Sequence, residues 1–145
     1  MKKQVEAWIK YAEKDILTVS EIKENPMLAN IAISHCQQAI EKYFKAFILE
    51  SNKPIKFIHN LITLYGTIKE TIDLELNEDL LSTVNDIYTE SRYPGEIGLL
   101  DDGTIPTIEQ AHQFFSFAKE IETKIKNELN KDIESTEELV IRNEE

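Results

Sequence analysis

The sequence predicts an all-α protein, an up-and-down four-helix bundle with one short additional helix. The 145 residues include only four glycines and four prolines, so few positions interrupt a helix. Apolar residues recur at steps of three and four along most of the chain, which places them on one face of a helix. Links between neighbouring helices are short, and short links favour antiparallel packing.

The first two helices are predicted over about residues 2–24 and from Pro26 or Met27 to about Ser51. The first has apolar residues at helical spacing: Val5, Trp8, Ile9, Ala12, Ile16 and Val19. Asn25 precedes Pro26, and proline both restricts the residue before it and fits a first helical turn. The second helix has a wide apolar stripe, which is typical of a central helix that packs against several neighbours.

Two further helices are predicted in the middle of the chain. A short third helix begins at Leu61, directly after His59 and Asn60. A fourth begins near Asn77, a favourable N-cap that is followed by acidic residues, and it ends by about Arg92.

The segment 93–106 is the one substantial loop, because it holds three of the four glycines and two of the four prolines. Long loops in compact bundles are often functional. Thr107 is a suitable cap for a fifth helix, whose apolar face includes Ala111, Phe115, Ala118, Ile121, Ile125 and Leu129. We expect one folded domain over residues 1–130 and an acidic tail over 131–145, either a frayed helix or disordered.

Composition and charge restrict the function classes. The net charge of −11 argues against a duplex-DNA binder, because such proteins neutralise phosphates with lysine and arginine. Residues 1–60 carry nine bases and seven acids, whereas residues 61–145 carry seven bases and twenty acids, so a basic surface can form only locally. The single cysteine, the lack of a secretory signal and the lack of a long apolar run predict a cytoplasmic protein without membrane contact.

No motif predicts a cofactor or a metal site. Glycine-rich phosphate loops, His-Glu-x-x-His and Gly-x-Ser-x-Gly are absent, and so are the paired Glu-x-x-His motifs of di-iron bundles. Cys36 lies on the apolar stripe of the second helix. Its neighbour His35 points about 100° away around the helix, so a buried structural cysteine is favoured over a nucleophile.

Two segments carry candidate binding residues. On the second helix, Lys42 and Lys45 belong to a polar strip and can jointly contact a phosphate; alternatively, the strip is solvated or pairs with another helix. At the end of the fourth helix, Arg92 is the only arginine before the tail, in a chain with fourteen lysines. Its planar, permanently charged group suits a bidentate phosphate or carboxylate partner, so both an anion site and a structural salt bridge fit.

Taken together, these segments resemble the HEPN domain family over about residues 4–130. The resemblance is carried by Trp8 with Ala12 and Asp15, by the run HCQQAIEKYFKAFIL, by His59-Asn60-Leu61 and by Glu90-Ser91-Arg92-Tyr93-Pro94. It implies a four-helix bundle with a short extra helix, a homodimer, and binding of nucleotides or single-stranded RNA. It also implies a toxin–antitoxin-like pairing with a minimal nucleotidyltransferase.

The ribonuclease members of that family use an Arg-x(4–6)-His motif. Arg92 corresponds to its arginine, but the positions for the histidine hold Ile97, Gly98 and Leu99. The chain is therefore expected to be a binding module more than a nuclease, since the imidazole for acid–base cleavage is missing.

The predicted ligand-binding residues are Arg92, Tyr93, Lys42, Lys45 and His59, and the carboxylates expected to orient them are Asp15, Glu41 and Glu90. Tyr93 is expected to stack on a base or to donate through its hydroxyl, and the resemblance also makes it a candidate for nucleotidylation. Two alternatives stay open. One is a ribonuclease toxin that uses Arg92 with a non-standard histidine such as His59, and the other is a structural dimeric adaptor without a ligand.

Overall fold

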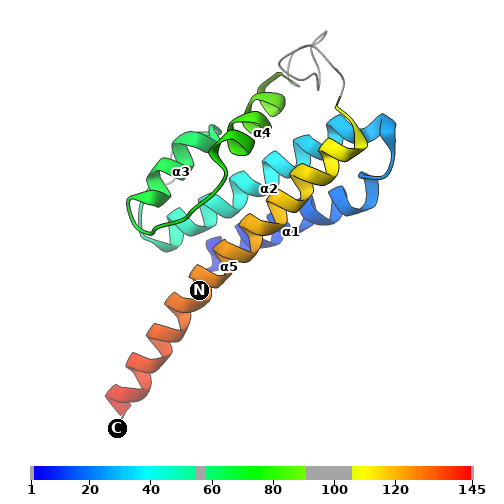
Figure 1. Ribbon diagram of the computed structural model, residues 1–145. Helices are drawn as coiled ribbons and strands as arrows, with labels where there is room; N and C mark the ends of the chain where they lie inside the picture. Colours follow the sequence, from blue (N-terminus) through cyan, green and yellow to red (C-terminus); the bar gives the residue numbers. More distant parts are fainter. Residues whose placement is uncertain (1, 55–57, 91–105, 145) are drawn as a thin grey trace.

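The computed structural model describes residues 2–54, 58–90 and 106–144, and the side chains of 88–90 and 132–144 are not described. The elements, in order, are α1 (Lys3–Ile22), the 3-10 turn η1 (Pro26–Leu28), α2 (Ala29–Glu50), α3 (Leu61–Lys69), α4 (Glu78–Glu90) and α5 (Ile108–Glu144). No strand occurs within these ranges. The long helices α1, α2, α4 and α5 alternate in direction, and α3 is the short additional helix (Figure 1). The predicted fold class is confirmed.

Side chains at the helix starts explain where these elements begin. The Asn25 side chain accepts a hydrogen bond from the backbone N–H of Met27, so the predicted second helix opens as the turn η1 before α2. The Asn77 side chain accepts from the backbone N–H of Leu80 at 3.1 Å, as expected of the cap of α4. Thr107 and Gln110 bond reciprocally to each other's backbone N–H groups, which forms a capping box at the start of α5.

Helix α2 is central, because it packs against α1, α3, α4 and α5. Its largest fully buried side chains are Ile33, Ile40, Tyr43 and Phe44. Cys36 is also fully buried, and burial raises the pKa of its thiol to about 12. The thiol therefore stays protonated near neutral pH, which agrees with a structural cysteine.

Helix α5 is longer than the other helices, and its C-terminal end extends past them (Figure 1). Its buried aromatic residues are Phe114 and Phe117, whereas the predicted core residue Phe115 is only partly buried. The backbone is helical through Glu144, and the separation of an acidic tail at residue 131 stays a prediction. Within the described ranges, no helix is both long and apolar enough to cross a membrane.

Candidate functional site

Packing of α1 on α2 places a carboxylate of α1 against the polar strip of α2. Asp15 lies 3.0 Å from His35 Nδ1, and it accepts a hydrogen bond from Lys42 Nζ at 2.5 Å. His35 and Lys42 are seven residues apart, about two helical turns, so they lie on the same face of α2. The Asp15 side chain is only 9% exposed. Asp15, His35 and Lys42 form what we call the Asp15 cluster, and a buried carboxylate holds its two basic groups in place.

A second carboxylate, Glu41, organises the neighbouring part of the strip. It accepts from Lys45 Nζ at 3.2 Å, and both of its oxygens lie 3.2 Å from His59 Nδ1. The Gln37 amide donates to Glu41 at 3.4 Å. We call these four residues the Glu41 cluster. Because His59 comes from the linker before α3, the Glu41 cluster ties that linker to α2.

The position of His59 follows from how α3 begins. The Asn60 side chain accepts from the backbone N–H groups of Ile62 and Thr63, at 2.9 and 3.2 Å, and so caps α3. The backbone N–H of Leu61 donates to Asn85 Oδ1 of α4 at 2.9 Å. The start of α3 is thus held between α2 and α4.

Aromatic rings of α1 lie beside the lysines of both clusters. Lys45 Nζ is 5.4 Å from the centre of the Trp8 ring, and Lys42 Nζ is 6.0 Å from the centre of the Tyr11 ring. Each of these lysines therefore lies near both a carboxylate and an aromatic ring. A shallow hollow of about 350 Å³ opens here, lined by Gln4, Ala7, Trp8, Tyr11 and Lys42.

Accessibility differs among the basic groups of the two clusters. The His59 side chain is 54% exposed, the Lys42 side chain 23%, and the Lys45 side chain only 6%. An anion from solvent would therefore meet Lys42 and His59 first, with Lys45 behind them. The clusters contain two carboxylates, two lysines and two histidines, so their charge is near zero with neutral histidines and positive when the histidines are protonated.

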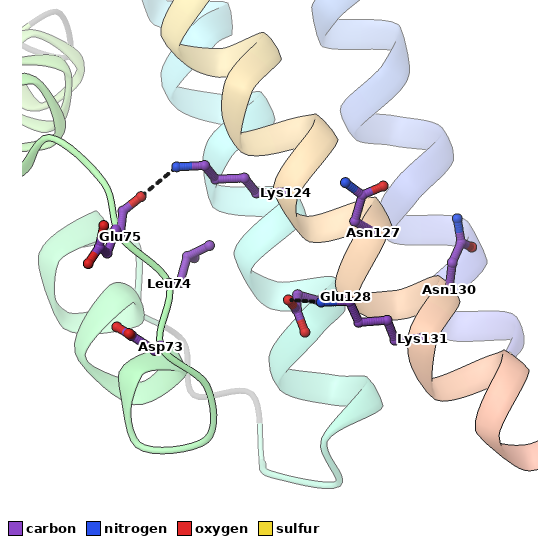
Figure 2. A pocket seen from close by; sticks show the side chains of 8 residues that line it. All are labelled: Asp73, Leu74, Glu75, Lys124, Asn127, Glu128, Asn130 and Lys131. Carbon is purple, nitrogen blue, oxygen red and sulfur yellow. Dashed lines mark hydrogen bonds and ion pairs between the residues drawn. The ribbon is translucent and has the colours of Figure 1, made fainter.

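A larger hollow, of about 570 Å³, lies between the α3–α4 connection and α5 (Figure 2). Figure 2 shows Lys124 reaching from α5 to the backbone oxygen of Glu75, which accepts its hydrogen bond at 2.7 Å. Glu128 and Lys131 pair at 3.1 Å on the same rim. None of the predicted site residues lines this hollow. We therefore place the candidate site on the α1–α2 face.

The structure brings together five of the predicted site residues, namely Asp15, Glu41, Lys42, Lys45 and His59. Their roles toward a ligand stay predictions. Sequence reasoning missed His35 and Tyr11. A signal for both was present, because His35 is two turns before Lys42, and Tyr11 is one turn before Asp15 and three residues after Trp8.

The other predicted residues lie outside what the structure describes. Arg92, Tyr93 and positions 97–99 belong to the undescribed segment 91–105, and the side chain of Glu90 is not described either. His112 lies 2.7 Å from the Glu24 carboxylate and belongs to neither cluster. Within the described ranges, no three His, Cys, Asp or Glu residues are grouped so that they could hold a metal ion.

Comparison with known proteins agrees with this fold. The family model for the HEPN domain matches residues 5–129. Among solved structures, the chain is similar to the crystal structure of an archaeal HEPN homologue, with a TM-score of 0.63 and 24% sequence identity. That alignment covers 88% of this chain and 98% of the homologue. No curated protein matches the chain. Because the family model covers most of the sequence, the chain belongs to the HEPN domain family.

Proposed function

We propose that this HEPN domain binds a nucleotide or a single-stranded RNA through its phosphates at the α1–α2 face. The observation that carries the proposal is the pair of clusters, in which Asp15 holds Lys42 at a partly open edge and Glu41 holds the buried Lys45 behind it. Lysine contacts to phosphate give modest affinity that falls as salt rises. A phosphate competes with Asp15 for Lys42, which keeps the affinity in the micromolar range.

Arg92 and Tyr93 complete the proposed site. The bond between Leu61 and Asn85 places the His59 linker beside α4, five residues before that helix ends at Glu90. Those five residues span about 7.5 Å along the helix axis. Arg92 follows Glu90 by two residues in the chain, and we propose that it serves the same phosphate. Its guanidinium suits a bidentate contact with a phosphate.

The biological setting that we propose is a toxin–antitoxin-like module. The HEPN protein, as a homodimer in the cytoplasm, is the helical partner of a minimal nucleotidyltransferase. Family membership supports this setting, and the missing histidine at positions 97–99 favours binding over cleavage. Copurification with a nucleotidyltransferase encoded beside it tests the pairing, and labelling of wild type but not of Tyr93→Phe tests nucleotidylation.

A ribonuclease remains the second candidate because of one observation, the contact between His59 and Glu41. A carboxylate beside a half-exposed imidazole can orient it for general acid–base catalysis. Here Arg92 and His59 would be the catalytic pair. This activity predicts cleavage of single-stranded RNA at neutral pH that both Arg92→Ala and His59→Ala abolish.

Calorimetric titration with ATP and with a short single-stranded RNA separates these functions. The binding module predicts micromolar binding, weakened by salt and lost in Arg92→Ala, with the recovered RNA intact on a gel. Cleaved RNA would support the ribonuclease. If neither ligand binds, the result would instead indicate a structural dimeric adaptor. Circular dichroism of Arg92→Ala controls for unfolding.

A further inference from the structure

The outer surface of α1 carries the apolar hollow next to the Asp15 cluster. Trp8 and Tyr11 are neighbours on this surface, and 56% of Tyr11 is exposed. Trp8 is partly buried and packs against the core, so its ring is fixed. The volume of about 350 Å³ lies at the small end of the range for ligand sites.

Cations lie close to both rings. Lys14 Nζ is 5.0 Å and Lys42 Nζ 6.0 Å from the centre of the Tyr11 ring, and Lys45 Nζ is 5.4 Å from that of Trp8. Aromatic rings beside a positively charged edge are the usual platform for single-stranded nucleic acids, because bases stack on the rings while phosphates meet the cations. The hollow supplies both features within two turns of α1.

We infer that the Trp8–Tyr11 hollow is a base-stacking subsite. It takes the nucleobase of the ligand whose phosphate contacts Lys42, and Lys14 contacts the same or the next phosphate. The inference rests on the proposed function and assigns the base a position that is separate from Tyr93. Since every base has a π-face, the subsite accepts all four bases with little preference.

Charge favours a nucleotide over an apolar protein surface as the occupant. Lys42 is paired with Asp15, but an apolar partner pressed into the hollow would desolvate Lys14 without giving it an anion. The cores of protein interfaces are depleted of lysine for this reason. A nucleotide fills the hollow with its base and leaves its phosphate at the lysine edge.

Fluorescence reports directly on the subsite, because Trp8 is the only tryptophan in the chain. We would titrate the protein with adenosine 5′-monophosphate and with ribose 5-phosphate, which has the phosphate but no base. The subsite predicts that the nucleotide quenches Trp8 and binds about tenfold more tightly than the sugar phosphate. Tyr11→Ala removes most of this difference and leaves binding of ribose 5-phosphate unchanged.

Leu17→Ala is the matched control, because Leu17 is also an exposed apolar residue of α1 but lies on a different side of the helix. It should retain the full preference for the nucleotide. Alanine is favourable in helices, so neither substitution should unfold α1.

Equal binding of the two ligands, with no change in Trp8 fluorescence, would overturn the subsite but not the proposed function. If neither ligand binds, both the subsite and the proposed function are overturned. In a third outcome, light scattering shows a smaller particle for Tyr11→Ala than for wild type, and the variant binds the nucleotide as tightly as wild type does. The occupant of the hollow would then be a second copy of the chain. That result also overturns the subsite.

Discussion

Lys42 and Tyr43 are neighbours on α2, and each bonds a carboxylate on another helix, yet their surroundings differ. Lys42 meets Asp15 of α1 at a partly open edge. Tyr43 is fully buried and donates its hydroxyl hydrogen bond to Glu122 of α5. The interior pair can bond only within the fold, whereas at the edge Lys42 can exchange Asp15 for another anion. Similar polar pairs can therefore serve stability in one region and binding in another.

Electrostatics agree with a structural role for the interior pair. Burial, together with the hydrogen bond to Glu122, raises the pKa of the Tyr43 hydroxyl above its usual value. Burial alone would raise the pKa of Glu122, but hydrogen bonds from Lys119 and Tyr43 lower it below its usual value overall. Near neutral pH the pair is therefore a neutral donor and a charged acceptor, a strong combination in a low-dielectric interior.

The largest expected effect comes from removing the interior side chain. Tyr43→Ala leaves a cavity among the core helices and takes a hydrogen-bond donor from Glu122. It should lower the free energy of unfolding by about 3–5 kcal/mol, measured by urea denaturation. Lys42→Ala, one residue away, should cost less, about 1–2 kcal/mol, because it takes one of two basic partners from the buried Asp15 carboxylate. Equal losses for the two variants would remove the distinction between the regions.

A pH series on Glu122→Gln sharpens the comparison. The folded-state pKa of Glu122 is below the usual value of 4.5, so its charge stabilises the fold above about pH 4.5. That stabilisation is lost as pH falls through the folded-state pKa. Wild type should exceed the variant in stability at pH 7, and the difference should shrink progressively below about pH 4.5. A difference that is constant from pH 7 to pH 4 and below would contradict the assigned charge.

A smaller loss is expected at the open edge. Asp15→Asn keeps the shape of the side chain but weakens its bonds to His35 and Lys42. Because Lys42 can turn toward water, we expect a cost of about 1–2 kcal/mol in urea denaturation. Glu24→Gln alters a carboxylate paired with His112 at the surface and should leave the denaturation midpoint unchanged. An Asp15→Asn midpoint equal to wild type would show that the Asp15 cluster does not stabilise the fold.

Most of the fold could be predicted because its signals are local. The spacing of apolar residues gives the helices, and Asn77 and Thr107 mark helix starts that the structure confirms. The link between Tyr43 and Glu122 could not be predicted, since it joins residues 79 positions apart. Periodicity also assigned Phe115 to the core, where Phe114 and Phe117 are more deeply buried. A helical step from Ala111 of three or four residues reaches either Phe114 or Phe115, so spacing alone does not choose between them.

The candidate site was predictable only in part, for a related reason. Lys42 and Lys45 stand out as cations on an apolar helix, so the strip was visible in the sequence. Asp15, Trp8 and Tyr11 come from α1, so their contacts with the two lysines depend on how α1 packs against α2. The extent to which Lys45 is covered could not be predicted, because it depends on Trp8 and Glu41 closing over it.

The most direct test of phosphate binding at the α1–α2 face compares two lysines with similar contacts. Like Lys42, Lys69 lies between a carboxylate, Glu78 at 2.9 Å, and an aromatic ring, Tyr65 at 4.5 Å, but it lies on α3. ATP should bind Lys42→Ala more weakly than wild type, with a salt dependence reduced by about one phosphate contact. Lys69→Ala should bind as wild type does. Unchanged binding by Lys42→Ala, or equal losses in both variants, would contradict a phosphate site at this face.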